Sequence, residues 1–276
     1  MTVDAIGPRE VHGAEAATVE SPDTRGAIVN LRVMTYNIHR AIGVDRRFRP
    51  ERIVEIVAHH DPDIALLQEV DDGAPRSREL DLARELAASL GYPHFAVGHN
   101  VDLRKGRWGN ATLSRHPIVS ERNIDLSVSP RKRRGCQHTS IRLERSPGPP
   151  VELEVFNLHL GLSAQERAWQ VGLLVRSEEF CAGDQSHPFL VGGDFNDWRS
   201  LLVPTFTEIL GFTCCTQRTG GSTSGILSFP AFSPSGALDR VYCRGPIRCV
   251  GGRSCRLRLS RVASDHLPII VDFELG

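Results

Sequence analysis

Several features that define particular protein classes are missing from this sequence. No apolar run is long enough to cross a membrane, and no basic stretch followed by an apolar core marks a secretory leader. The net charge of +0 and the pI of about 7.2 argue against a protein that coats nucleic acid non-specifically. We therefore expect a soluble, cytoplasmic protein with no transmembrane segment and no obligate protein partner.

Cysteine is present, but without a pattern that would build a metal site or a disulfide framework. The sequence has seven cysteines, an odd number, and none of them forms a C-x-x-C pair. Zinc sites and disulfide-rich domains need regular cysteine spacings. The cysteines are therefore expected to be reduced, structural thiols.

The N-terminal stretch lacks apolar periodicity. Residues 1–28 are rich in Ala, Gly, Glu, Thr and Pro, which predicts a disordered tail. The remaining residues, 29–276, are expected to form a single domain, because 40% of the chain is hydrophobic and enzymes with two sheets reach this size as one unit.

The pattern of apolar residues predicts helices and strands that alternate at both ends of the domain, with a strand-rich region between them. Expected helices cover residues 50–60, 76–90, 163–180 and 201–210. Expected strands cover residues 31–37, 64–70, 94–99, 107–114, 117–125, 136–144, 151–160, 189–191, 237–243, 248–258 and 266–275. This order favours two sheets packed face to face with helices outside. A doubly wound nucleotide-binding fold is the alternative, but residues 37–40 are not the glycine-rich loop that it needs.

Polar side chains stand at the ends of many of the expected strands. The clearest case is Asp194 and Asn196, which follow the apolar run 189–191 and the glycine pair 192–193. Strand ends in a layered fold converge on one edge, so such side chains can share a pocket. Asn37, Glu69 and His159 also end their strands, whereas Asp239 lies within a strand and Asp265 and His266 stand where the final strand begins.

The chemistry of this set favours a hard metal ion. Each residue alone has a structural explanation as a turn former, a cap or an ion-pair partner. Together, however, Glu69, Asp194 and Asp265 supply carboxylates, and asparagine adds neutral oxygens, which suits Mg²⁺ and also Mn²⁺. Two histidines beside these carboxylates suit proton transfer and charge stabilisation.

The ordered set of motifs resembles the endonuclease/exonuclease/phosphatase superfamily, whose fold is that of deoxyribonuclease I. The matching segments cover about residues 31–275 and are Met34-Thr35-Tyr36-Asn37, Leu67-Gln68-Glu69-Val70, Gly109 to Arg115, Asn157-Leu158-His159-Leu160, Gly192 to Asn196, Leu238-Asp239-Arg240 and Ser264-Asp265-His266. The resemblance implies a four-layered α/β sandwich with two mostly antiparallel sheets and helices outside. It also implies metal-dependent hydrolysis of a phosphate ester.

The resemblance assigns a role to each matched residue. Glu69 would bind Mg²⁺, with Asn37 and Asp265 close to the metal. Asp194 would orient or deprotonate the attacking water, Asn196 would hold a phosphate oxygen, and His159 would donate to a non-bridging oxygen. His266, positioned by Asp239, would act as the base or stabilise the transition state.

Two further residues are predicted to contact substrate. The basic run Arg131 to Arg134 is either a solvated loop or a cationic rim that attracts a phosphate-bearing substrate, and Arg134 is the member expected to reach the site. Asn110 is expected to form hydrogen bonds within the site.

The sequence therefore predicts a Mg²⁺-dependent phosphodiesterase. Its phosphodiester substrate is a nucleic acid, a lipid headgroup or a small diester. The first alternative is a DNA or RNA nuclease of the same fold, which would bind polynucleotide in a strongly salt-dependent way. The second is a non-catalytic binding protein that keeps the fold.

Overall fold

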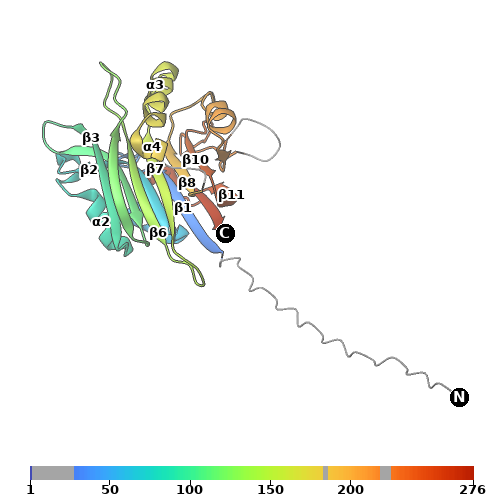
Figure 1. The fold of residues 1–276 in the computed structure, drawn as a ribbon. Helices are drawn as coiled ribbons and strands as arrows, with labels where there is room; N and C mark the ends of the chain where they lie inside the picture. Colours follow the sequence, from blue (N-terminus) through green and yellow to red (C-terminus); the bar gives the residue numbers. More distant parts are fainter. Residues whose placement is uncertain (2–27, 183–185, 218–224) are drawn as a thin grey trace.

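Two six-stranded sheets form the centre of the molecule (Figure 1). The computed structural model describes residues 1, 28–182, 186–217 and 225–276. The predicted disordered tail, residues 1–28, lies almost entirely outside the described residues. The prediction of a single domain over residues 29–276 stays a prediction.

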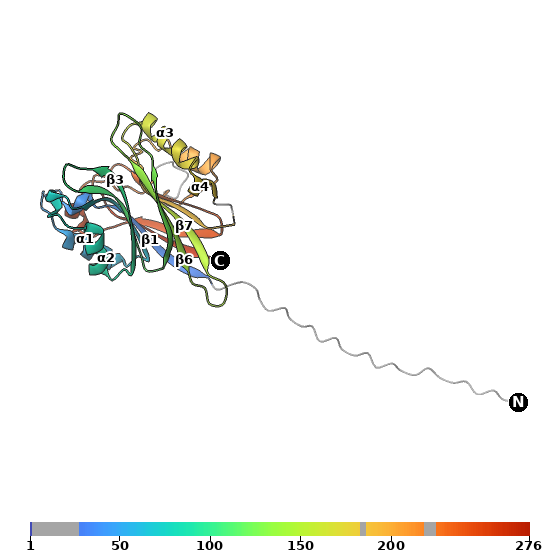
Figure 2. The same ribbon diagram turned by 60° about the vertical axis from the view of Figure 1, so that its left-hand side comes forward.

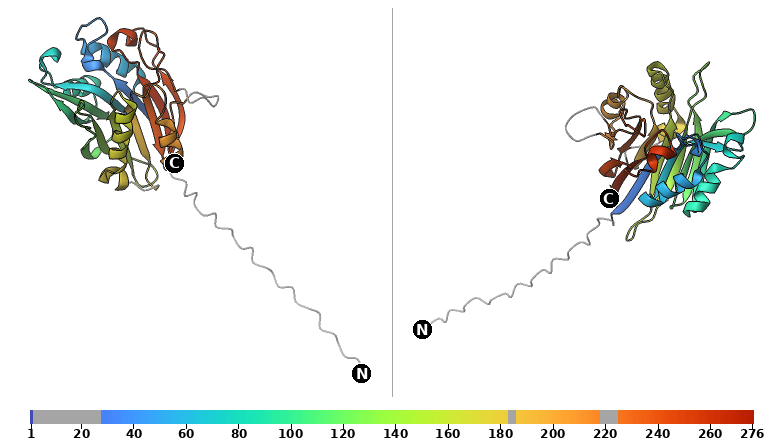
Figure 3. Two further views of the ribbon diagram at one scale, coloured as in Figure 1. Left: turned by 90° about the horizontal axis from the view of Figure 1, so that it is seen from above. Right: turned by 180° about the vertical axis from the view of Figure 1, so that it is seen from behind.

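The first sheet has the strand order β11-β12-β1-β2-β4-β3. Its strands are β1 (Val29–Asn37), β2 (Ile64–Asp72), β3 (His94–Asp102), β4 (Arg107–Ser114), β11 (Ile247–Ser254) and β12 (Ile269–Leu275). Only β1 and β2 pair in parallel, and the other neighbours are antiparallel. Strands from the two ends of the chain are therefore adjacent, and Figure 3 shows the blue first strand beside the red last strand.

The second sheet has the order β5-β6-β7-β8-β10-β9. Its strands are β5 (Ile118–Asp125), β6 (Gly135–Leu143), β7 (Val151–His159), β8 (Phe189–Asp194), β9 (Thr213–Cys214) and β10 (Asp239–Arg244). Here β7 and β8 are the parallel pair. Both sheets are thus mostly antiparallel, as predicted.

Helices cover the outer face of each sheet (Figure 2). The apolar faces of α1 (Pro50–His60) and α2 (Leu82–Leu90) pack on Met34 and Tyr36 of the first sheet. On the other side, α3 (Ala164–Val175) and α4 (Glu178–Ala182) pack on Phe156 and Phe189 of the second sheet. A third apolar cluster, which includes Leu66 and Val155, fills the space between the sheets. The four-layered sandwich is confirmed.

Several helix boundaries differ from those predicted. Residues 75–77 form a separate 3₁₀ turn, and α2 begins only after Asp81, whose carboxylate caps the helix by accepting from the Arg84 amide. The predicted helix 163–180 is divided, because α3 ends at Val175 and α4 starts at Glu178. The predicted helix 201–210 is reduced to a π-helical turn, Thr205–Ile209.

The remaining short elements are a 3₁₀ turn at His39–Ala41 and the helix α5 (Ser260–Ala263), which ends just before Asp265 and His266. Among the described residues, no helix is both long and apolar enough to span a membrane.

Candidate active site

Asp194 lies at the centre of the candidate site, at the end of β8. The strand is buried throughout, and the Asp194 side chain is only 1% exposed. The residue before it, Gly193, has φ of 141°, and a Cβ there would lie 2.0 Å from the main-chain oxygen of Leu158. Glycine is therefore required for β7 and β8 to approach so closely. This contact places His159, at the end of β7, opposite Asp194.

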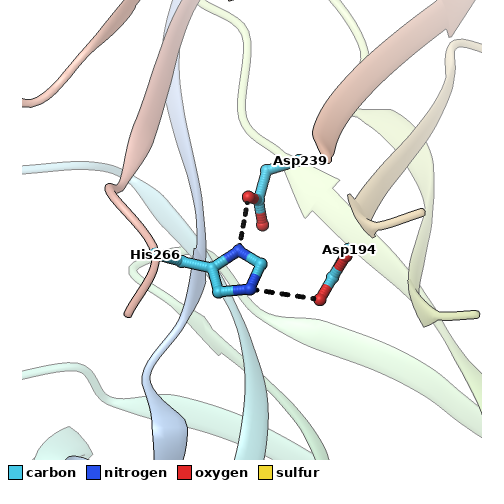
Figure 4. A group of neighbouring side chains, drawn as sticks. All are labelled: Asp194, Asp239 and His266. Carbon is cyan, nitrogen blue, oxygen red and sulfur yellow. Dashed lines mark hydrogen bonds and ion pairs between the residues drawn. The ribbon is translucent and has the colours of Figure 1, made fainter. Parts of the chain in front are cut away.

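His266 connects Asp194 to a second buried carboxylate (Figure 4). Its Nδ1 lies 2.7 Å from Asp239 Oδ2, and its Nε2 lies 3.7 Å from Asp194 Oδ2. Asp239 is the first residue of β10, which pairs with β8 so that Asp239 lies opposite Asp194. The strand pairing therefore fixes the spacing of the two carboxylates, and the imidazole lies between them.

Two further side chains converge on the same Asp194 oxygen. The Asn37 amide donates to Asp194 Oδ2 over 3.1 Å, and His159 Nε2 lies 3.5 Å from that atom. The other oxygen, Oδ1, accepts the backbone amide of Asn196 over 2.9 Å. Residues from β1 and β7, from the segment after β8 and from the segment before β12 thus meet at one carboxylate.

Asn196 is held in a fixed orientation beside this cluster. Its φ is 50°, and its side-chain amide donates to the main-chain oxygen of Leu160. Asparagine tolerates this left-handed conformation better than most residues. The amide of Asn196 therefore bridges the ends of β7 and β8.

Burial and charge set the protonation states of the cluster. Burial raises the pKa of Asp194 to about 6, although the charge of His266 opposes this. Burial by itself would lower the pKa of His266, but the charges of Asp239 and Asp194 outweigh it and raise the pKa to about 10. Burial, followed by the charge of Arg134, holds the pKa of His159 well below its usual value. At neutral pH His266 is therefore protonated, His159 is neutral and Asp194 is ionised.

The sequence predicted that Glu69 ends its strand, but in the structure the strand extends beyond it. The strand continues to Asp72, and Glu69 lies in a bulge where the pairing with β4 shifts between Leu67 and Val70. Its φ is 56°, an uncommon conformation for glutamate. Arg40 Nη2 lies 3.3 Å from Glu69 Oε2, which accepts no hydrogen bond from any described residue.

Asp265 and Asn110, which were predicted to lie near the metal and the substrate, differ in burial and in hydrogen bonding. Asp265 is half-buried, and its carboxylate accepts from the Ser264 hydroxyl. Asn110 is fully buried, and its amide donates to the main-chain oxygens of Gly135 and Asn157. It contributes to packing between the sheets, and its contact with substrate stays a prediction.

Arg134 brings a buried positive charge to the site. It is 7% exposed, and its Nε and Nη1 have no hydrogen-bond partner among the described residues. Burial lowers its pKa, while the charges of Asp194 and Glu69 oppose that change. A buried guanidinium with free donors is a binding group for an anion.

Sequence reasoning left out the contacts of several residues that build the site, among them Lys132 of the predicted basic run. Lys132 Nζ lies 4.3 Å from the ring of Trp108, and this ring lies 6.1 Å from that of His159. Arg40 pairs with Glu69, and its left-handed conformation gives no sequence signal. The side-chain amides of Gln68 and Asn157 also build the site through their hydrogen bond; both residues fall in the matched family segments, but the sequence alone assigned them no role of their own.

The donor set fits a hard divalent metal. Asp194, Asp239 and His266 each offer a ligand atom within 4.8 Å of the others. The short hydrogen bond between His266 and Asp239 already uses two of these atoms, so this trio is also suited to proton transfer. Glu69 Oε2 accepts no hydrogen bond from a described residue, so this oxygen is available as a metal ligand.

Comparison with known proteins shows the family of this chain. The profile of the endonuclease/exonuclease/phosphatase family matches residues 34–266. The chain belongs to this family. It is 31% identical over 258 residues to the protein YbhP of Escherichia coli K12, covering 89% of this chain and 97% of YbhP.

Solved structures of the family share the fold. The mannosyl-6-phosphatase Bt3783 of Bacteroides thetaiotaomicron is similar with a TM-score of 0.68 and 20% identity, over 88% of this chain and 99% of that protein. ANGEL2, a 2′,3′-cyclic phosphatase, is similar with a TM-score of 0.69 and 16% identity, over 90% of this chain and 96% of that protein. Members of the family are typically phosphoesterases, and enzymes with this fold generally depend on a metal.

Proposed function

We propose that this protein is a Mg²⁺-dependent phosphodiesterase whose reaction centre is the Asp194–His266–Asp239 cluster. The observation that carries the proposal is the position of one imidazole between two buried carboxylates, at 2.7 Å and 3.7 Å. Such an arrangement positions a proton for transfer and stabilises developing charge. Membership of a phosphoesterase family supports this chemistry.

The protonation states divide the work between Asp194 and His266. Asp194 is ionised at neutral pH and accepts the proton of the attacking water, since its raised pKa makes it a better base than an ordinary aspartate. His266 is already protonated, so it donates to a phosphate oxygen as negative charge builds up. Asp239 holds the imidazole in orientation and favours its charged form.

The surrounding residues bind and orient the phosphate. His159 and Asn196 direct donors at its non-bridging oxygens, and Arg134 supplies a positive charge that no described side chain neutralises by a hydrogen bond. Glu69, with Asn37 and Asp265 nearby, would hold Mg²⁺, and Mn²⁺ suits the same donors. When bound, the metal supplies further neutralisation of the phosphate charge.

The test is hydrolysis of the chromogenic diester bis-p-nitrophenyl phosphate. We expect turnover with Mg²⁺, loss of turnover with EDTA, and a decrease of ~10²–10⁴-fold in kcat for His266→Ala. His59→Ala is the matched control, because His59 is exposed on α1 and lies outside the cluster. Equal rates for wild type and His266→Ala would refute the proposal.

A nuclease remains the second candidate because Arg131 to Arg134 form a basic run that leads to the buried Arg134. A nuclease would bind an oligonucleotide with an affinity that falls steeply as salt rises. Salt-independent binding, together with hydrolysis of small diesters, would favour the phosphodiesterase. A binding protein on this fold would show no turnover with any divalent metal.

A further inference from the structure

Three cysteines cluster on the side of the sandwich formed by β9, β10 and β11, outside the candidate active site. Cys215 directly follows β9, Cys243 lies in β10, and Cys249 lies in β11. The Cys215 thiol donates to the Cys243 sulfur over 3.4 Å. The Cys249 thiol donates to the main-chain oxygen of Cys215 over 3.9 Å. The side chains of Cys215 and Cys249 also form a hydrogen bond with each other, so Cys215 contacts both other thiols.

The cluster joins the two sheets at their edges. β9 is the edge strand of the second sheet, and β11 is the edge strand of the first. Cys215 continues the pairing of β9, since its amide donates to the main-chain oxygen of Val241. A bond between Cys215 and Cys249 would therefore connect the two sheets, whereas one between Cys215 and Cys243 would stay within a single sheet.

The three thiols differ in access. Cys243 is 2% exposed and lines no described cavity. Cys249 is half-buried and, with Cys215, lines a surface cavity of about 810 Å³ whose wall also contains Arg253 and Arg256. A small reagent can therefore reach Cys249, while Cys243 is covered by the core between the sheets.

Cys249 also has the more reactive thiol of this pair. A side-chain hydrogen bond with Cys215 lowers the pKa of Cys249, although burial opposes this. Hydrogen bonds to Cys243 and Cys249, and then burial, raise the pKa of Cys215. The thiolate is the nucleophile in thiol oxidation, so the first step falls on Cys249.

We propose that Cys249 is an oxidation site that reacts with hydroperoxides and forms a disulfide with Cys215. The Cys249 thiolate attacks one peroxide oxygen, the O–O bond breaks, and the leaving alkoxide takes a proton to become an alcohol, or water for hydrogen peroxide. Cys249 is then a sulfenic acid. The Cys215 sulfur attacks the Cys249 sulfur, the S–O bond breaks, and water leaves with the Cys215 proton. Two thiols are oxidised and one hydroperoxide is reduced.

Mass spectrometry tests this assignment on the full chain. The reduced protein is treated with a small excess of hydrogen peroxide, denatured and alkylated. Of its seven cysteines, two should resist alkylation, with the mass lowered by two hydrogen atoms. Trypsin separates the candidate partners, because Cys243 lies in the peptide 241–244 and Cys249 in the peptide 249–253. The crosslink should join peptide 249–253 to peptide 200–218.

Variants assign the sulfur atoms. Cys249→Ser should lower the crosslinked fraction by at least about tenfold, and it is suited to the test because its half-exposed position tolerates the change. Cys215→Ser should have the same effect. Cys214→Ser is the matched control for the neighbouring cysteine, and Cys181→Ser is the control for an exposed one; both should crosslink like wild type. A crosslink to peptide 241–244, seven alkylated thiols after peroxide, or unchanged crosslinking in Cys249→Ser would overturn the assignment.

Discussion

Replacing Asn157 by leucine should destabilise the junction between the two sheets beside the active site. Asn157 is fully buried in β7, and its amide donates to the main-chain oxygens of Leu67 and Ala111 over 3.2 Å and 3.0 Å. Its Oδ1 accepts from Gln68 Nε2 over 2.8 Å. One side chain of the second sheet is thus hydrogen-bonded to β2 and β4 of the first.

The magnitude follows from the groups left without a partner. Leucine has a similar size but no polar atoms, so the oxygens of Leu67 and Ala111 lose a donor inside the protein. Each such loss costs about 1–3 kcal/mol, or about 2–6 kcal/mol for the two. The added apolar surface of leucine offsets up to ~2 kcal/mol of this. With the full offset the net cost is about 0–4 kcal/mol, and we expect the free energy of unfolding to fall by about 2 kcal/mol, the middle of this range.

Urea denaturation of wild type and variant measures this change. Asn123→Leu is the matched control. The Asn123 amide donates hydrogen bonds to His99 and Asn100 at an exposed position, so its replacement should change stability by no more than about 0.5 kcal/mol. Leu67 and Gln68 lead directly into the bulge at Glu69, so Asn157→Leu should also lower the affinity for Mn²⁺ measured by calorimetry. A loss of stability no larger than in Asn123→Leu would refute the reasoning.

Three further predictions concern the site itself. Because the pKa of Asp194 is raised to about 6 and its ionised form accepts the proton, kcat/KM should fall as pH falls through about 6, and a flat pH–rate profile down to pH 5 would contradict the assignment. Arg134→Met should raise KM for the diester by about tenfold. It should leave the urea midpoint unchanged or higher, because it removes a buried charge whose Nε and Nη1 lack hydrogen-bond partners among the described residues. A lower midpoint with unchanged KM would show a structural role. Gly193→Ala should destabilise the fold by more than about 1 kcal/mol in urea denaturation, because its Cβ would lie 2.0 Å from the Leu158 oxygen, and wild-type stability would show that β7 and β8 can separate there.

Much of the fold was accessible from the sequence because most of the strands carry an apolar signal of their own, although the two-residue β9 was not predicted. The cluster around Asp194 was also accessible in part, since Asn196 lies two residues after Asp194 in the chain and His266 lies three residues before β12. Both lie close to a strand end, where the edge of the sheet brings polar groups together. The family motifs add the order in which these segments occur.

Other features depend on tertiary structure that leaves no local signal. The bulge that sets the conformation of Glu69 arises from its register with β4 and looks like ordinary strand in the sequence. The hydrogen bond between Gln68 and Asn157 joins residues 89 positions apart. The start of α2 was missed because Asp81 caps the helix, although the apolar pattern begins earlier. In each case the feature depends on strand pairing, a long-range hydrogen bond or helix capping, and the local pattern of apolar residues does not determine it.

The most direct test of the central claim is the rate of diester hydrolysis by wild type and Asp194→Asn, measured side by side in saturating Mg²⁺. The substitution keeps the size of the side chain and removes the charge that three strands and His266 surround. We expect the variant to remain folded and to lose at least about 10²-fold in kcat. A folded Asp194→Asn protein with the wild-type rate would show that the reaction takes place elsewhere.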